Sequence, residues 1–362
     1  MTSQTTAEIA DEPPASAGTP PEASERSGPG VPTIAAIARE LGVSVPTVSK
    51  VLNGRADVAP TTRARVEEAL RRHRYRRRPS RRPAGTGLVD LAFHELGSMW
   101  SMEIIRGVEA AAARRGTSVI LSDLSGSHRP PRTWLETTLA RPPLGVLLVA
   151  AQLDPAQQHR LVSRSIPVVV IDTDGEPPAD VPTVGSDNWA GGLAAARHLL
   201  QLGHRRVAAI SGPSDMLCSR ARMDGFRSAH AEAGVPLDPA LVREGDFTQE
   251  VGYAQALDLL RGPDRPTAVF AGSDLQALGV LRAARELGLG VPGDLSVVGY
   301  DDLPIVEWTA PRLTTVRQPL ADMGALATSM LLDLVDGRTP ATLRVNLATE
   351  LVVRESTAPP GA

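Results

Sequence analysis

Residues 33–53 read T-I-A-A-I-A-R-E-L-G-V-S-V-P-T-V-S-K-V-L-N, and their spacing predicts two short amphipathic helices joined at Gly42. The apolar residues of the first helix recur at i, i+3, i+4 and i+7, so one face is expected to be buried; they are Ile34, Ile37, Ala38 and Leu41. Thr33 stands where an N-cap belongs, and Gly42 supplies the tight backbone that the turn needs. The stretch therefore predicts a helix-turn-helix, which makes DNA the first partner to consider.

The second helix is expected to begin at Ser44, whose hydroxyl can cap it. Pro46 fits the first turn, because a proline there loses no hydrogen bond. With Val48, Val51 and Leu52 turned inward, the outer face and the ends carry short contact groups suited to a major groove; these are Val45, Pro46, Thr47, Ser49, Lys50 and Asn53. A third helix, roughly 61–73, is expected to close a three-helix core with Val66, Ala69 and Leu70.

Positive charge is concentrated in this module. Residues 31–82 hold 13 Lys/Arg against 4 Asp/Glu, a net charge of +9, although the whole chain of 362 residues carries only −3. Residues 1–30 carry −4, and the residues from 83 onward carry −8. Neutralisation of phosphates and release of counterions drive non-specific DNA affinity, so this asymmetry indicates a nucleic-acid partner. The alternative is a basic helix face that is simply solvated.

Composition excludes several other classes. The longest apolar stretch, 144–151, is too short to cross a bilayer. Residues 1–30 are acidic and rich in Pro, Ser, Thr and Ala, so a disordered tail is expected rather than a secretory signal, and the protein is expected to be cytoplasmic. Cys218 is the one cysteine and the seven histidines lack metal-ligand spacing, so neither a metal nor a cofactor is expected. The one lysine, Lys50, lies outside any phosphate-binding glycine loop.

After Gly87 the sequence alternates short apolar runs with helical patterns, which is typical of parallel βαβ units. Strands are expected at 88–93, 118–122, 145–150, 167–171, 207–211, 268–271 and 296–300. Helices are expected at 103–115, 154–165, 188–202, 219–233, 249–260 and 274–287. Roughly 270 residues of this pattern predict two doubly wound lobes rather than one.

Five motifs in a fixed order carry a resemblance. They are G-V-S-V-P-T-V-S-K-V-L-N at 42–53, L-G-H-R-R at 202–206, R-M-D-G-F at 222–226, V-V-G-Y-D-D at 297–302 and L-T-T-V-R-Q-P at 313–319. From Thr33 to about Glu355 the chain resembles the lactose-repressor (LacI/GalR) family of transcription factors. The resemblance implies an all-α helix-turn-helix headpiece and an α/β periplasmic-binding-protein-like core of two doubly wound lobes.

The resemblance also implies a domain plan. After the tail at 1–30, it places the DNA-binding domain at 31–76, a basic hinge at 77–86 and an effector-binding and dimerisation domain at 87–357. Chain crossovers near 185–187, 317–320 and 345 interleave the lobes. Lobe 1 is expected at about 87–185 and 320–344, and lobe 2 at about 186–317 and 347–356.

By similarity, Val45 and Pro46 touch base edges, and Lys50 touches a base or a neighbouring phosphate. The backbone contacts fall to Thr33, Ser44, Thr47, Ser49 and Asn53. The hinge departs from the family, because it is about three residues shorter than usual and Pro79 and Pro83 obstruct a regular helix. Its arginines are expected to enter a narrow minor groove or clamp phosphates, with a flexible basic linker as the alternative; they are Arg77, Arg78, Arg81 and Arg82.

Effector contacts are expected outside the carboxyl ends of the strands of the core. Asp172 and Asp301 each follow an apolar strand, and Arg222 matches the family arginine that reaches the ligand from the opposite lobe. Carboxylates accept sugar hydroxyls and a guanidinium donates to them, so the three suit a polyhydroxyl ligand. Further matches are Trp100, expected in the first β–α loop, and Asn188, Phe247, Ser273 and Asp274. Each also has a structural alternative, as a helix cap or start, a buried ring or a structural ion pair.

These expectations combine into one function. The resemblance implies a repressor, not an enzyme, that binds a pseudo-palindromic operator as a homodimer and responds to a small effector, a sugar or oligosaccharide in most relatives. Two alternatives are an exported solute-binding protein and an α/β enzyme. The first has no use for residues 33–75, and the second lacks support because the sequence contains no G-x-S-x-G nucleophile elbow and no metal cluster.

Overall fold

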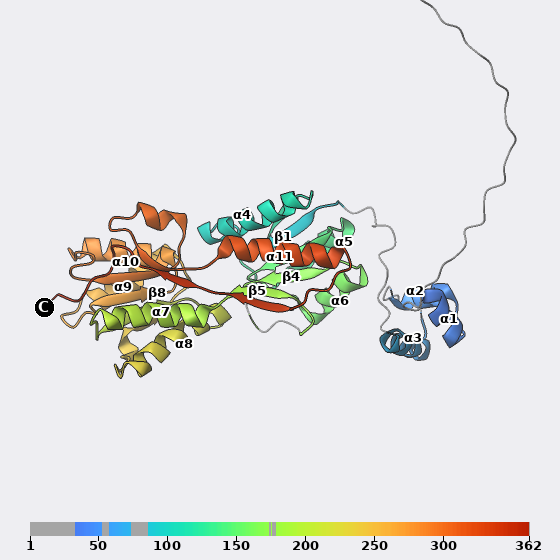
Figure 1. The fold of residues 1–362 in the computed structure, drawn as a ribbon, viewed down its shortest axis with the longest axis horizontal. Helices are drawn as coiled ribbons and strands as arrows, with labels where there is room; N and C mark the ends of the chain where they lie inside the picture. The colour runs from blue at the N-terminus through green and yellow to red at the C-terminus, as the bar shows by residue number, and fades with distance from the viewer. Residues whose placement is uncertain (1–32, 53–57, 74–85, 174, 176–178, 362) are drawn as a thin grey trace, which may run out of the picture. The chain divides into compact units, whose positions relative to one another are not determined.

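The computed structural model describes residues 33–52, 58–73, 86–173, 175 and 179–361. They fall into two compact units, one within residues 1–76 and one within 77–362, and each unit is described by itself. We call the first the headpiece and the second the core (Figure 1).

The headpiece contains three helices, α1 (Ile34–Leu41), α2 (Val45–Leu52) and α3 (Pro60–Arg72). The Thr33 side chain accepts a hydrogen bond from the backbone N–H of Ala36, which confirms the predicted N-cap. Gly42 has φ 66°, the left-handed conformation that an L-residue avoids, so the turn requires glycine. The predicted helix-turn-helix is confirmed, with the third helix one residue earlier than expected.

The headpiece core is small and fully enclosed. Ile37, Val48 and Val66, one from each helix, have no exposed surface. Burying a side chain of this size stabilises the folded state by about 1.5–3 kcal/mol, so these three side chains supply most of the apolar stabilisation of so short a module. Val58 adds a fourth contact from the segment before α3.

The core is built on two six-stranded sheets. The first has the order β11-β5-β4-β3-β1-β2 and is entirely parallel; its strands are β1 (Val89–Phe93), β2 (Val119–Asp123), β3 (Gly145–Val149), β4 (Val168–Ile171), β5 (Thr183–Ser186) and β11 (Arg344–Leu347). The second has the order β12-β10-β9-β8-β6-β7; its strands are β6 (Val207–Ser211), β7 (Val242–Glu244), β8 (Ala268–Ala271), β9 (Ser296–Asp301), β10 (Thr314–Arg317) and β12 (Glu350–Val352). Only β12 is antiparallel to its neighbour among these described strands. We refer to the two sheets with their helices as lobe 1 and lobe 2.

Helices cover both faces of each sheet (Figure 1). On lobe 1 these are α4 (Met99–Arg114) and α11 (Leu320–Val335) on one face, with α5 (Arg132–Ala140) and α6 (Pro155–Ser163) on the other. On lobe 2, α9 (Gln249–Leu260) and α10 (Asp274–Glu286) cover one face, with α7 (Asn188–Gln201) and α8 (Leu217–Glu232) on the other. Two short 3-10 helices are η1 (Pro239–Leu241) and η2 (Pro304–Trp308). A sheet buried on both faces explains why the central strands read as continuous Val/Ile/Leu/Ala runs.

The chain passes between the lobes three times, from β5 to α7, from β10 to α11 and from β11 to β12. Strand β5 ends at Ser186, so lobe 1 includes this residue rather than stopping at 185. Strand β11 extends lobe 1 to Leu347, three residues beyond the expected 344, so the third crossover lies at 348–349.

Seven predicted strands and six predicted helices are present, within a few residues of their expected ends. Strands β5, β7, β10, β11 and β12 and helices α5 and α11 were not predicted. Trp100 was expected in a loop, but Ser98 caps α4 and places Trp100 in the first turn of that helix.

Candidate functional site

The exposed side of α2 carries the predicted base contacts. Val45 is 46% exposed, unusual for a valine at the start of a helix, and Pro46 and Lys50 are exposed beside it. The Ser44 hydroxyl accepts a hydrogen bond from the Thr47 backbone N–H at 3.2 Å, so Ser44 acts as the cap of α2. An exposed valine methyl pair is suited to the C5-methyl group of thymine.

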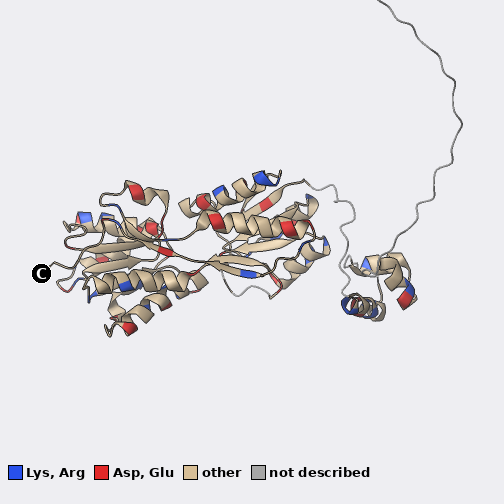
Figure 2. Ribbon diagram, in the orientation of Figure 1, with Lys and Arg blue, Asp and Glu red and all other residues tan. Residues whose placement is uncertain are grey.

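The basic surface of α3 is partly neutralised. Glu40 of α1 forms an ion pair with Arg72 and a hydrogen bond with His73, and Glu68 pairs with Arg71. Acidic side chains of α1 and α3 therefore pair with some of the basic residues of α3; Figure 2 colours basic residues blue and acidic residues red. Arg65 instead donates to the Leu41 carbonyl at 3.0 Å and holds α3 to the turn between α1 and α2. Asn53 and the hinge arginines Arg77, Arg78, Arg81 and Arg82 lie outside the described residues.

In lobe 2 the candidate effector site is organised around Arg222, on α8. The side chain is 4% exposed, and its guanidinium donates to Asn188 Oδ1 at 2.8 Å and to the Gly272 carbonyl at 2.5 Å. The guanidinium carbon lies 3.8 Å from the centre of the Tyr300 ring and 5.4 Å from that of Phe247. Two hydrogen bonds and two aromatic faces hold the charge in one position.

Asp301, at the end of β9, is the carboxylate nearest to this guanidinium. Its Oδ1 lies 3.8 Å from Arg222 Nη1 and accepts a hydrogen bond from Gln318 Nε2 at 2.6 Å. Burial raises the pKa of Asp301 to about 6, against the opposing effects of Arg222 and Gln318. The acid is therefore close to its titration range at neutral pH, which marks it as a functional candidate.

Asp172 belongs to lobe 1, where it directly follows β4. Burial raises the pKa of Asp172, while the charge of Arg222 in lobe 2 acts to lower it. The Asp172 side chain accepts no hydrogen bond from any residue that the structure describes. Its acceptor sites remain available to a ligand.

Three of the residues associated with Arg222 have positive φ angles although none is glycine. They are Asp172 (51°), Phe247 (68°) and Asp301 (115°). Such conformations cost about 1–3 kcal/mol each and tend to gather at ligand-binding sites. Their grouping supports a binding role for this region over a purely structural one.

Ser273 and Asp274 have internal partners. The Ser273 hydroxyl donates to the Phe247 carbonyl and accepts from the Gln276 backbone N–H, so Ser273 caps α10. Asp274 is fully buried, and its two oxygens accept from the Thr315 hydroxyl at 2.5 Å and the Leu303 backbone N–H at 2.8 Å. Burial raises the pKa of Asp274 well above its usual value. These hydrogen bonds match the structural alternative for both residues. The bond from Ser273 positions Phe247, and the bond that Asp274 accepts from Leu303 positions the start of η2.

Trp100 is half-buried and packs against the apolar cluster that α4 and α11 share, which also includes Leu303 of lobe 2. Three other residues surround the guanidinium or its partners and were not singled out as ligand contacts: Cys218, Tyr300 and Gln318. Tyr300 and Gln318 stand inside the quoted motifs at 297–302 and 313–319, so the signal for them was present in the sequence.

The described residues contain no group of three or more His, Cys, Asp or Glu side chains arranged to hold a metal ion. Within the same residues, no helix is both long enough and apolar enough to cross a membrane. The core thus holds a buried cluster of polar groups around Arg222, and the headpiece is a helix-turn-helix. The two features in one chain are typical of ligand-responsive DNA-binding proteins.

Comparison with known proteins agrees. Residues 33–78 match the bacterial regulatory proteins of the lacI family, and residues 196–357 match the periplasmic binding protein-like domain. The chain is 33% identical over 330 residues to the HTH-type transcriptional repressor CytR of Escherichia coli (strain K12), covering 90% of this chain and 96% of CytR. It is 37% identical over 336 residues to the HTH-type transcriptional regulator CelR of Thermobifida fusca, covering 90% and 98%.

Solved structures show the same architecture. A CelR–cellobiose complex matches with a TM-score of 0.68 at 36% identity, over 90% of this chain and 99% of that one. The lac repressor dimer bound to operator and an anti-inducer matches with a TM-score of 0.65 at 26% identity, over 91% and 100%. The chain belongs to the lacI family of bacterial regulatory proteins. It is a DNA-binding transcriptional regulator, and the relatives named here are regulators rather than transport proteins or enzymes.

Proposed function

We propose that this regulator is a repressor that binds a pseudo-palindromic operator as a homodimer in the cytoplasm and responds to a sugar or oligosaccharide bound between its lobes. The observation that carries the proposal is that Arg222 of lobe 2 lies 3.8 Å from Asp301 and also acts on the charge of Asp172 in lobe 1. A ligand that bridges these groups contacts both lobes at once and therefore favours one angle between them. Such differential affinity is what an effector needs, and it typically amounts to about 1–3 kcal/mol.

The chemistry of the three groups favours a polyhydroxyl ligand. Two carboxylates accept hydroxyl protons, and a guanidinium held by Asn188 donates in return. The Phe247 ring beside Arg222 offers an apolar face for the C–H side of a sugar ring. The relative CelR was solved with cellobiose, a ligand of this chemical class.

For the operator we assign base-edge contacts to Val45, Pro46 and Lys50, the exposed residues on α2. Thr33, Ser44, Thr47, Ser49 and Asn53 are assigned to the DNA backbone. The arginines of the hinge, which lies outside the described residues, are assigned to phosphates or the minor groove. One headpiece spans only a few base pairs, so a specific site requires two.

We assign the contact with the second subunit to an exposed apolar surface on lobe 2. Trp308 on η2 is 78% exposed, and it borders a cavity of about 600 Å³ whose apolar lining includes Leu281 and Ile305. Exposed apolar side chains also mark lobe 1, namely Met102 on α4 and Ile120 and Leu121 on the edge strand β2. Apolar surface of this kind is typical of an interface, and an isologous contact would present it twice.

The first experiment selects bound duplexes from a random pool with the full-length protein, and then titrates cellobiose and a panel of mono- and disaccharides into the complex. The variant Arg222→Ala is expected to keep operator affinity and lose the sugar response. Its matched control, Arg227→Ala, removes an exposed arginine of the same helix that pairs only with Asp224 among described residues, and it should retain both. If Arg222→Ala responds to sugar as the wild type does, the assigned site is misplaced.

The dimer is tested by sedimentation velocity. Trp308→Glu is expected to shift the protein toward a monomer and to weaken operator binding, because it places a charge in the apolar contact. Val162→Glu changes a valine of α6 that is 61% exposed and should leave the dimer intact. An unchanged sedimentation coefficient for Trp308→Glu would remove η2 from the interface.

A further inference from the structure

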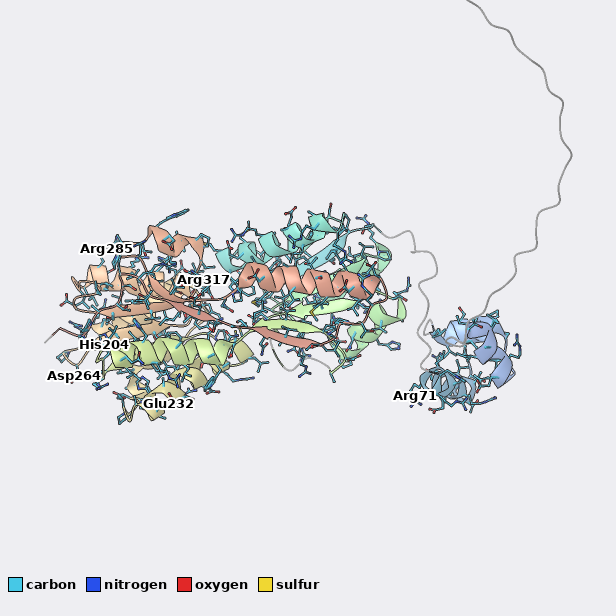
Figure 3. All side chains as sticks on the ribbon, in the orientation of Figure 1. Arg71, His204, Glu232, Asp264, Arg285 and Arg317 are labelled. Atoms are coloured by element: carbon cyan, nitrogen blue, oxygen red, sulfur yellow. The ribbon has the colours of Figure 1, made fainter. Side chains whose placement is uncertain are left out.

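Two adjacent aspartates at the end of β9 hold two adjacent residues of the crossover into α11. Asp301 accepts from Gln318 Nε2 at 2.6 Å, and the neighbouring Asp302 accepts from Arg317 Nε at 2.7 Å. Figure 3 labels Arg317 close to where this crossover enters α11. Both aspartates have positive φ, so the backbone is bent in a way that turns successive side chains to different partners.

The Gln318 amide has a second partner, in the other lobe. Its Oε1 accepts from the Ser186 hydroxyl at 2.5 Å, and Ser186 is the last residue of β5 in lobe 1. Ser186, Gln318 and Asp301 are each 5% exposed or less. A buried line of two hydrogen bonds therefore runs from the carboxylate of the candidate effector site to the first crossover.

The direction of both bonds follows from the groups present. An ionised carboxylate only accepts, so the amide must turn its NH₂ to Asp301 and its oxygen to Ser186. A glutamine satisfies both partners with one planar group. Methionine has a similar length but cannot form either bond, and a glutamate can donate only when it carries a proton.

Asp302 forms ion pairs with residues at the crossovers, and these ion pairs do not involve the candidate ligand. It also accepts from Arg354 at 2.6 Å, and Arg317 reaches Glu350 of β12 at 3.4 Å. These ion pairs fasten the second and third crossovers to lobe 2. Asp301 is left as the member of the pair that both a ligand and the crossover can engage.

We propose that Gln318 is the positioning residue that ties the effector-site carboxylate Asp301 to Ser186 of the opposite lobe. The regulatory consequence rests on the proposed function: a ligand hydroxyl that engages Asp301 shifts the amide, and the amide shifts the crossover. Gln318 itself need not touch the ligand. Among the described residues, Ser186 and Asp301 form no hydrogen bond with each other, and each forms one with Gln318, which is therefore the group that can couple them.

A mutant cycle tests this tie without DNA or sugar. The unfolding equilibrium constant of the full-length protein is measured by urea titration for Ser186→Ala, Asp301→Ala and the double variant, with Gln318 present and again with Gln318→Met. With Gln318 present, the two substitutions should deviate from additivity by about tenfold, and with Met they should be additive within about twofold. Additivity in the presence of Gln318 would overturn the proposal.

A second measurement separates hydrogen bonding from packing. Gln318→Glu preserves the shape of the side chain, so a residue that only fills space would tolerate it at any pH. The proposal expects a large loss of stability at pH 8, where two carboxylates face each other, and recovery of at least about tenfold in the unfolding constant at pH 5, where a shared proton restores the donor. Gln158→Glu is the control, because Gln158 also donates to a carboxylate, Asp180, but at an exposed site within lobe 1. A pH response no larger than that control would refute the proposal.

Where a saccharide weakens operator binding by the wild type, Gln318→Met should retain operator binding and reduce that effect toward onefold. The mutant cycle and the pH series do not depend on this outcome. Failure of the sugar or operator experiments is therefore distinguishable from failure of the Gln318 proposal.

Discussion

Helices α7 and α8 touch through glycines, and adding one methyl group to this contact should displace Arg222. A Cβ at Gly192 would lie 2.0 Å from the backbone oxygen of Arg222, and one at Gly225 would lie 2.0 Å from that of Trp189. Carbon–oxygen contacts of a real Cβ are essentially never below 3.0 Å, so Gly192→Ala requires the two backbones to separate by about 1 Å.

The cost follows from what this movement breaks. The Arg222 guanidinium donates at 2.8 Å to Asn188 and at 2.5 Å to Gly272, and a displacement of about 1 Å stretches such bonds to or beyond their useful range. Overpacking costs about 1–3 kcal/mol, and weakened bonds of a buried charge add to it. We expect Gly192→Ala to lower the free energy of unfolding by about 3 kcal/mol and to weaken sugar binding, although the new methyl group lies on the backbone side of the site.

Urea unfolding followed by tryptophan fluorescence measures the loss, because Trp189 lies in α7 at this contact. Gly262→Ala is the matched control: no heavy atom lies within 4 Å of its added Cβ and its φ is ordinary, so its effect should stay within about 0.5 kcal/mol. If the unfolding free energy of Gly192→Ala lies within about 0.5 kcal/mol of the wild-type value, the helices separate without cost and the reasoning fails.

Three further predictions concern pH, the turn and salt. Folding raises the pKa of Asp301 from 3.8 to about 6, so the protonated acid stabilises the fold below pH 4 and this contribution is lost as the pH rises through 6. In urea titrations, the free energy of unfolding of Asp301→Asn should therefore improve relative to the wild type by up to about 3 kcal/mol between pH 4 and 7. A difference between the two proteins that stays constant with pH would contradict the raised pKa. The Cβ added by Gly42→Ala meets no atom within 4 Å, so the substitution should cost only the strain of the left-handed backbone. Thermal unfolding of the headpiece should show a loss of about 1–2 kcal/mol in stability, and Gly42→Asn should lose less. Operator affinity measured against salt should fall steeply, with a logarithmic slope near −0.9 for each phosphate neutralised, and a flat response would argue against phosphate contacts by the basic module.

The elements that sequence predicted well are those whose residues carry their own pattern. Buried central strands such as β3 and β4 are unbroken apolar runs, and α1 has a cap, an apolar stripe and a closing glycine between Thr33 and Gly42. The missed strands β7, β11 and β12 have three or four residues with exposed or half-exposed side chains, so their strand character comes from the neighbour they pair with. Helix α11 was also missed, although its buried residues Met323, Ala327 and Leu331 recur at a helical spacing, so the signal for it was present in the sequence.

The candidate site divides in the same way. Asp172, Arg222 and Asp301 were singled out because each stands at the end of a strand or in a family motif; in the structure Arg222 lies 3.8 Å from Asp301, and its charge also acts on Asp172. Asp274 belongs to the same motif-rich part of the chain, but only the folded chain shows that Thr315 and Leu303 occupy its oxygens. Gln318 could not be singled out from spacing, because its two partners are 132 and 17 residues away and belong to different lobes.

The threefold passage of the chain between the sheets has an evolutionary consequence. Neither lobe corresponds to a continuous stretch of gene, since lobe 1 takes β11 from near the end of the chain and lobe 2 takes its strands from both sides of α11. Recombination at a single point cannot transplant one lobe without leaving its sheet short of a strand. The headpiece is one uninterrupted segment, so new pairings of operator and inducer should arise by exchanging that cassette against an intact core.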